Sequence, residues 1–271
     1  MKASFRKVAI AGFGAIGREV ARRLDAGIPG FELVAVAARD VAKAARNAAT
    51  LRRPPRIEPL AALPELADVI IECVPAAAFV EAVGPALDLG RIVLTVSAAA
   101  LLDHPEMVDR AAKSGGRLIL ATGALLGLDA VRAAAIGTIS SVRMVTAKPP
   151  RSLAGAPYLK QQGIDVSQLT QPLRVFAGTA REGARAFPAN VNVAAALALA
   201  GIGPDRTQLE VWADPALTRN THRIEVEADS ARFSMAIENV PSEDNPGTGK
   251  ITALSLIAAL RDLAAPLRIG T

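Results

Sequence analysis

The 271-residue chain contains one cysteine, Cys73, and only two histidines, His104 and His222. A single thiol excludes an internal disulfide and suits a reducing cytoplasm. No His, Cys and carboxylate cluster has metal-ligand spacing, so we expect no bound metal. Aromatic residues make up 3% of the chain and hydrophobic residues 51%. The core must therefore be built mainly from Ala, Val, Leu and Ile.

Long uninterrupted hydrophobic runs are also missing. The apolar run from Val8 is broken by three glycines and then by charged residues, which is unlike a signal peptide. The stretch from Val191 to Gly203 is shorter than the roughly 20 residues that span a bilayer. The formal net charge is +5, but the basic residues are dispersed and not interleaved with aromatics. We therefore expect a cytoplasmic protein that binds neither membrane nor nucleic acid.

Short apolar runs alternate with segments of helical spacing through the first part of the chain. Continuous apolar strands separated by helices predict an α/β fold, with a doubly wound parallel sheet covered on both faces. The predicted strands are Lys7–Ala11, Phe31–Ala37, Val69–Cys73, Ile92–Val96 and Leu118–Leu120, and the helices are Ile16–Asp25, Val41–Thr50, Ala76–Leu89 and Pro105–Lys113.

After about residue 125 consecutive strands joined by turns indicate a second, α+β domain with an antiparallel or mixed sheet. We expect a dinucleotide-binding domain over 1–125 and a substrate and dimerisation domain over 126–250. We expect the last segment, 251–271, to pack back on the first domain. The predicted elements are helices Leu128–Ala135, Val191–Ala200 and Ile251–Leu263, and strands Ser140–Thr146, Leu173–Gly178, Gln208–Ala213, Thr221–Ala228 and Arg232–Glu238.

A glycine motif, Gly12-Phe13-Gly14-Ala15-Ile16-Gly17, joins the first predicted strand to the first helix. This G-x-G-x-x-G spacing in a strand-turn-helix context is typical of a Rossmann dinucleotide site. Gly12 permits the tight turn, Gly14 lets the backbone approach a diphosphate, and Gly17 lets helix and strand pack closely. The helix N-terminus then offers N–H groups to the diphosphate. The motif predicts binding of NAD or NADP.

The end of the second strand lacks the usual ribose-binding acid. Ala38 stands where that acid is expected, and Arg39 and Asp40 follow. Arg39 can pair with a 2′-phosphate, which makes NADP use plausible, or it can be a solvated surface charge. Asp40 is either a displaced ribose ligand or a helix N-cap.

Several segments together carry a family resemblance. They are Gly12–Gly17, Glu72-Cys73, Thr122-Gly123-Ala124, Gly127-Leu128-Asp129, Lys148-Pro149-Pro150, Phe187–Ala195, Asp214-Pro215, Asn220-Thr221-His222 and Asn245-Pro246-Gly247-Thr248. In this order and spacing the sequence resembles the L-aspartate dehydrogenase family over essentially the whole chain.

The resemblance implies oxidation of L-aspartate to iminoaspartate with NAD or NADP, or the reverse reductive amination of oxaloacetate with ammonia. Iminoaspartate in turn feeds NAD biosynthesis. By the same resemblance the positions of Ala124 and Asn190 contact the nicotinamide cofactor, and His222 is the active-site residue. The departure at Ala38 leaves the choice between NAD and NADP open.

The chemistry of amine oxidation agrees with these positions. The amine must be neutral to give up hydride, and histidine titrates near neutrality, so His222 can act as general base or activate the hydrolytic water. The two substrate carboxylates need cationic or donor groups. Candidates are Lys148, Thr248 before the last helix, and Asn192. Each of these can instead be a surface residue, a helix cap or a packing residue.

Two alternatives remain. The chain can be a related two-domain enzyme such as homoserine dehydrogenase or dihydrodipicolinate reductase, which would turn over another substrate. It can also be a non-catalytic NAD(P)-binding sensor, for which His222→Ala would change nothing measurable. An exposed face on the second-domain sheet favours a homodimer.

Overall fold

The structure is a computed structural model that describes residues 5–188, 191–244 and 247–270. The chain divides into two compact units. The first comprises Met1–Ala121 with Thr252–Arg268, and the second comprises Thr122–Ile251 with Ile269–Thr271. The last helix therefore belongs to the first unit although it follows the second in sequence.

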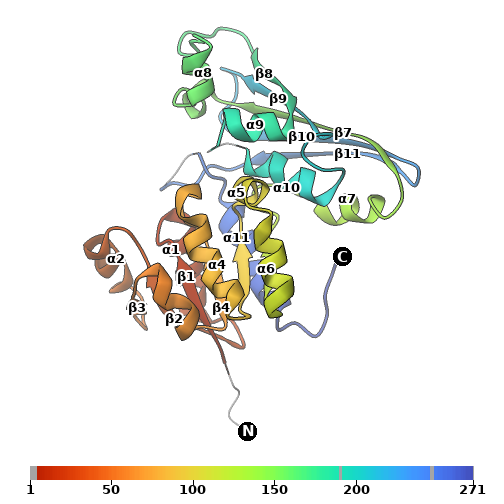
Figure 1. Cartoon of the computed structure of the whole chain (residues 1–271). Helices are drawn as coiled ribbons and strands as arrows, with labels where there is room; N and C mark the ends of the chain where they lie inside the picture. The colour runs from red at the N-terminus through yellow and green to blue at the C-terminus, as the bar shows by residue number, and fades with distance from the viewer. Residues whose placement is uncertain (1–4, 189–190, 245–246, 271) are drawn as a thin grey trace. The chain divides into compact units, whose positions relative to one another are not determined.

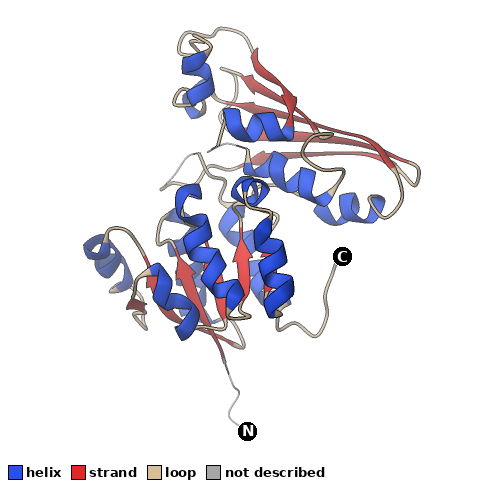
Figure 2. Cartoon of the chain, viewed as in Figure 1, coloured by secondary structure: helices blue, strands red, loops and turns tan. Residues whose placement is uncertain are grey.

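In the described residues, the first unit holds one sheet of six strands in the order β3-β2-β1-β4-β5-β6 (Figure 2). All of its strand pairs described are parallel. This is the strand order of a dinucleotide-binding Rossmann sheet, so the predicted fold class is confirmed. The strands are β1 (Arg6–Ala11), β2 (Phe31–Ala37), β3 (Arg56–Ile57), β4 (Val69–Glu72), β5 (Ile92–Thr95) and β6 (Arg117–Leu120).

Helices cover both faces of this sheet (Figure 1). One apolar cluster joins alternate residues of β1 to α1, α2 and α11, and a second cluster joins the other residues of β1 to α3, α4, α5 and α6. Because both faces are buried, the strands read as continuous apolar runs. The helices are α1 (Ala15–Gly27), α2 (Val41–Ala48), α3 (Leu63–Leu66), α4 (Phe79–Asp88), α5 (Ala98–Asp103), α6 (Glu106–Ser114) and α11 (Ile251–Asp262).

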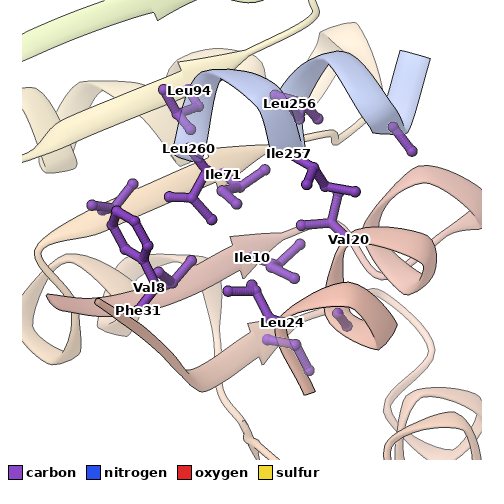
Figure 3. Packing of buried hydrophobic residues seen from close by; sticks show 14 of the residues in the cluster. Val8, Ile10, Val20, Leu24, Phe31, Ile71, Leu94, Leu256, Ile257 and Leu260 are labelled. Carbon is purple, nitrogen blue, oxygen red and sulfur yellow. The ribbon is translucent and has the colours of Figure 1, made fainter. Parts of the chain in front are cut away.

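The C-terminal helix α11 contributes directly to the first of these clusters. Its buried Leu256, Ile257 and Leu260 face Val20 of α1 and Ile71 of β4 (Figure 3). Each such side chain removed from water stabilises the packing by roughly 1.5–3 kcal/mol. The helix thus completes one side of the Rossmann unit.

The second unit contains, in its described part, a sheet of five strands in the order β11-β10-β7-β9-β8. The β7–β9 pair is parallel and the other pairs are antiparallel, so the expected mixed sheet is confirmed. Its strands are β7 (Ile139–Lys148), β8 (Leu173–Thr179), β9 (Gln208–Ala213), β10 (Asn220–Ala228) and β11 (Arg232–Asn239), and its helices are α7 (Leu128–Ala134), α8 (Pro157–Gln161), α9 (Ala180–Ala186) and α10 (Asn192–Ala200).

Several short elements were not expected from the pattern. β3, α3 and α5 are too short for a hydrophobic period to reveal them. The 3-10 turns η1 (Leu60–Ala62) and η3 (Pro150–Ser152) have only three residues each and were also not expected. A third turn, η2 (Ala76–Ala78), falls within the predicted helix Ala76–Leu89, which the structure divides into η2 and α4. Helix α9 did carry a local signal, because the Thr179 hydroxyl and the Glu182 carboxylate form a capping box at its start. None of the described helices has the length and hydropathy that crossing a membrane requires.

Candidate functional site

The glycine turn between β1 and α1 has the geometry that its sequence predicts. Gly12 has a φ of +99°, and a side chain there would collide with the carbonyl oxygen of Cys73. A Cβ at Gly17 would collide with the carbonyl oxygen of Gly12, where α1 crosses close to the turn. Glycine is therefore required at both positions for steric reasons.

Gly14 differs from these two glycines because nothing lies within 4 Å of the position that its Cβ would occupy. Gly14 is the N-cap of α1 and makes no side-chain cap. Ala15 and Ile16 are the first two residues of the helix. The carbonyl oxygen of the N-cap residue Gly14 accepts a hydrogen bond from Arg18 N. An open backbone surface in front of a 13-residue helix is a suitable place for a diphosphate. These residues fit a dinucleotide cofactor.

At the end of β2 the adjacent residues Arg39 and Asp40 have different structural roles. The Asp40 carboxylate accepts a hydrogen bond of 2.9 Å from the backbone N–H of Lys43 and caps α2. Asp40 is therefore the N-cap, as one of the two readings of the sequence held. Arg39 is exposed, in a position from which a guanidinium can meet a 2′-phosphate.

A fully buried carboxyl group lies at the end of β4. Glu72 Oε1 accepts hydrogen bonds from Val74 N at 2.8 Å and Ser97 Oγ at 3.1 Å, and its Oε2 accepts one from Thr95 Oγ1 at 2.5 Å. Burial raises the pKa of Glu72 from 4.5 to about 7, although these hydrogen bonds oppose the shift. Burial also raises the pKa of the neighbouring Cys73 thiol well above its usual range, so this thiol is not a nucleophile at neutral pH.

A group of polar side chains is buried at one end of the second sheet. His222 on β10 pairs in register with Thr146 on β7, and Lys148 lies two residues further along β7. Alternate residues of a strand share a face, so these three side chains lie on the same face. His222 Nδ1 is 3.1 Å from Thr146 Oγ1. Lys148 is 4% exposed and His222 is 3% exposed, which shows that both ionisable groups are withdrawn from solvent.

Burial changes the ionisation of both groups. It lowers the pKa of Lys148 from 10.5 to about 8. Burial, and secondarily the charge of Lys148, lowers the pKa of His222 from 6.5 to about 3. At pH 7 His222 is therefore neutral and Lys148 is largely protonated, which gives a single positive charge beside a neutral imidazole. This arrangement can receive an anion and accept a proton.

Two asparagines extend this polar group, and the sequence analysis did not identify them as site residues. Asn220 and Asn239 are both buried and pair with one another across β10 and β11. Asn239 Nδ2 donates a hydrogen bond of 2.9 Å to the carbonyl oxygen of Ala124. It thereby fixes the loop for which the resemblance implies a cofactor contact. The available signal was the resemblance segment Asn220-Thr221-His222, which places Asn220 two residues from His222.

The remaining predicted residues lie in less enclosed positions. Asn192 is exposed at the start of α10, and Thr248 is half-buried in the segment before α11. The carbonyl oxygen of Thr248 accepts a hydrogen bond of 2.8 Å from Ser242 N. Asn190 lies outside the described residues. His104, the other histidine, contacts Glu106 Oε1 through Nδ1 at 3.1 Å and stacks on Phe79, as a structural residue does.

Comparison with protein families matches both halves of the chain. Residues 129–263 match the family model for the C-terminal part of aspartate dehydrogenase. Residues 12–121 match the model for the NAD-binding domain of homoserine dehydrogenase. The chain thus carries an NAD-binding domain, while the more specific match lies in the half that contains Lys148 and His222.

Individual proteins are similar over almost the whole length. The L-aspartate dehydrogenase of Bradyrhizobium diazoefficiens is 56% identical over 98% of this chain and 94% of its own. L-aspartate dehydrogenase 3 of Bordetella bronchiseptica is 53% identical over 97% of each chain. The crystal structure of aspartate dehydrogenase from Thermotoga maritima has the same fold, with a TM-score of 0.75, 23% identity, and coverage of 98% of this chain and 99% of that one. The chain belongs to the L-aspartate dehydrogenase family.

Proposed function

We propose that this protein oxidises L-aspartate to iminoaspartate with NAD or NADP, and catalyses the reverse reaction. Hydride leaves the substrate Cα, the amine gives up a proton, and water then converts the imine to oxaloacetate and ammonia. The observation that carries the proposal is the buried group of Lys148, Thr146 and His222 in a chain of this family.

The first unit holds the cofactor in this proposal. The N–H groups at the start of α1 and the open backbone at Gly14 receive the diphosphate. When bound, the nicotinamide supplies the acceptor for hydride. Arg39 contacts the 2′-phosphate when the cofactor is NADP. The family resemblance assigns a cofactor contact to Ala124, whose carbonyl oxygen accepts a hydrogen bond from Asn239, and to Asn190, which lies outside the described residues.

Lys148 binds one substrate carboxylate. A lysine that is 4% exposed gains strongly from an anionic ligand, because its charge is little screened by solvent. The carboxylate in turn favours the charged form and raises the pKa of Lys148 from its value near 8. Thr248 and Asn192 offer donors to the second carboxylate, as binding of a dicarboxylic amino acid requires.

His222 accepts the proton of the substrate ammonium, or activates the hydrolytic water. It is neutral at pH 7 and so has a nitrogen lone pair available. Thr146 Oγ1 lies 3.1 Å from Nδ1 and orients the ring. In the tautomer whose Nδ1–H donates to this oxygen, Nε2 carries the lone pair and accepts the proton. In the unliganded protein His222 is a weak base. The charge of a bound dicarboxylate raises its pKa and makes proton transfer easier.

An initial-rate screen tests the proposal. L-aspartate, D-aspartate, L-glutamate, L-homoserine and L-alanine are each assayed with NAD and with NADP at pH 8. We expect reduction of the cofactor with L-aspartate at a kcat/KM at least about tenfold above that for the other amino acids. Turnover with homoserine but not aspartate would contradict the assignment. Cofactor binding without turnover of any amino acid would instead indicate a sensor.

We also propose that the protein forms a homodimer through the exposed face of the second sheet. That face carries positive and negative side chains. Arg143 forms an ion pair with Glu210 and lies 3.7 Å from Glu225. Glu225 also forms an ion pair with Arg223. A surface with both signs of charge can complement a second copy of itself about a two-fold axis. Light scattering over a hundredfold range of concentration should give twice the mass of one chain. The Arg223→Glu variant should give a mass closer to that of a single chain.

A further inference from the structure

The carboxyl ends of the first sheet hold a buried acidic residue to which the proposed reaction gives no role. Glu72 is the last residue of β4 and is 0% exposed. It pairs in register with Ala11 on β1 and with Thr95 on β5. Ligands bind at the carboxyl ends of strands in sheets of this type. Glu72 therefore lies under the edge at which the cofactor binds.

The hydrogen bonds around Glu72 are arranged for an ionised carboxylate. Val74 N–H can only donate. Thr95 Oγ1 accepts a hydrogen bond of 2.9 Å from Ser97 N and donates its own hydrogen to Glu72 Oε2. A protonated carboxyl would be a weaker acceptor with a hydrogen of its own to place among these donors. Ionisation of Glu72 thus orders the backbone at two points, Val74 after β4 and Ser97 after β5.

The loop that follows Glu72 lies directly against the phosphate turn. Cys73 Sγ is 3.3 Å from the carbonyl oxygen of Gly12, and Cys73 N donates to Ala11 O at 2.9 Å. The carbonyl of Cys73 also leaves no room for a side chain at Gly12. A shift of the 73–74 backbone would therefore be passed to the turn that receives the diphosphate.

We propose that Glu72 is a positioning residue for the dinucleotide: its carboxylate holds the loops after β4 and β5 against the phosphate turn, and its protonation loosens them. The inference rests on the proposed function, because it assumes that this turn binds NAD(P). Because Glu72 is 0% exposed, its effect on the cofactor is indirect. It acts through the backbone of Val74 and Ser97.

The charged state of Glu72 changes in the physiological range. Burial raises its pKa to about 7, against the opposing hydrogen bonds of Thr95, Ser97 and Val74. Burial, and secondarily the charge of Glu72, raises the pKa of the neighbouring Cys73 thiol, which stays protonated near neutrality. The residues opposite Glu72 on β1 and β5 are the uncharged Ala11 and Thr95. His222, with a pKa of about 3, stays neutral between pH 6 and 8.

Titration of NADH binding against pH tests the inference. NADH is the probe because it lacks the 2′-phosphate, whose second pKa near 6 would obscure the result. With a pKa of about 7, Glu72 is about nine-tenths ionised at pH 8 and one-tenth at pH 6. If only the ionised form binds well, the NADH Kd rises about tenfold between these pH values. A wild-type Kd that is flat, or that tightens as the pH falls, overturns the inference.

Glu72→Gln removes the titration while keeping the shape. An amide nitrogen facing Val74 N–H places two donors together, and one facing Thr95 leaves that hydroxyl hydrogen without an acceptor. We expect an NADH Kd that changes less than twofold from pH 6 to 8 and stays near the wild-type value at pH 6. The matched control is Glu81→Gln on α4, where the carboxylate is exposed, and it should keep the wild-type profile. A Glu72→Gln profile parallel to wild type overturns the inference.

Ser97→Ala provides a second test that does not require Glu72→Gln to fold. It deletes one hydrogen bond to the ionised form, so the pKa of Glu72 rises and the midpoint of the NADH profile moves to higher pH. An unmoved midpoint contradicts the inference. The two proposals fail separately: a protein that binds NADH but does not oxidise aspartate loses the proposed function, and one that oxidises aspartate with a pH-independent NADH Kd loses only the role of Glu72.

Discussion

The imidazole of His222 and the hydroxyl of Thr146 meet across two antiparallel strands, with Nδ1 and Oγ1 3.1 Å apart. The two residues are 76 positions apart in sequence, and register between β10 and β7 alone brings them together. The contact fixes one ring nitrogen of a buried, neutral histidine. It also places that ring on the sheet face that carries Lys148.

Replacing His222 separates catalysis from cofactor binding. We predict that His222→Ala lowers kcat for L-aspartate by about 10²–10⁴-fold, the usual contribution of a positioned acid or base. The NADH Kd should change less than twofold, because the phosphate turn belongs to the other unit. Stopped-flow kinetics and NADH fluorescence titration measure these quantities. The matched control is His104→Ala, which should keep kcat, and loss of NADH binding in His222→Ala would reassign the residue.

Removing the charge of Lys148 should weaken the binding of L-aspartate. We predict that Lys148→Met raises the KM for L-aspartate at least about tenfold, since a desolvated ion pair with a carboxylate contributes more than an exposed one. The NADH Kd should not change. Lys160→Met, which alters an exposed lysine of α8, is the control. An unchanged KM for aspartate would place the substrate carboxylates elsewhere.

The exposed Arg39 tests cofactor selection. We predict that Arg39→Ala raises the Kd for NADPH about tenfold and the Kd for NADH less than twofold, because only NADPH carries the 2′-phosphate. Calorimetric titration with both cofactors gives the ratio. Arg46→Ala on α2, also an exposed arginine, should leave the ratio as in the wild type. Equal losses for the two cofactors would show that Arg39 does not contact this phosphate.

Two glycines of the phosphate turn should respond differently to a methyl group. A Cβ at Gly17 meets the Gly12 carbonyl oxygen, whereas a Cβ at Gly14 meets no atom within 4 Å. We predict that Gly17→Ala lowers the free energy of unfolding by about 2 kcal/mol or more. Gly14→Ala should change it by less than about 0.5 kcal/mol but weaken NADH binding at least about fivefold. Urea unfolding measures the stability of both variants, and NADH titration measures their affinity. Tight NADH binding by Gly14→Ala would show that the diphosphate does not bind at this residue.

Buried His222 should also make stability depend on pH. Its pKa is about 3 in the folded protein and 6.5 when unfolded. Between these values the unfolded chain binds more protons, so the free energy of unfolding falls as the pH is lowered, by up to about 1.4 kcal/mol per pH unit. We predict that His222→Gln loses less stability than the wild type from pH 6.5 to 4.5, with no such difference in slope above pH 7.5. Urea unfolding measures it, and parallel losses below pH 6.5 would contradict the burial of a neutral ring.

Local sequence pattern was sufficient for most of the first unit. The run of Phe31–Ala37 was predicted with the bounds that β2 has, because a strand buried on both faces is a continuous apolar segment between turns. The strand-turn-helix order around Gly12 and Gly17 likewise follows from steric needs that glycine alone meets. The two-residue β3 and the four-residue α3 were not predicted, because such segments are too short to show a hydrophobic periodicity.

The candidate site depended on tertiary structure to a greater degree. Sequence reasoning selected Lys148 and His222 one at a time. The pairing of β7 with β10 places Thr146 beside His222 and puts Lys148 on the same face. In the sequence Glu72 was only part of a resemblance segment, and its raised pKa comes from burial in the folded protein. Composition and periodicity report what each residue prefers locally. Long-range pairing decides which polar groups are buried together, and burial decides their charge.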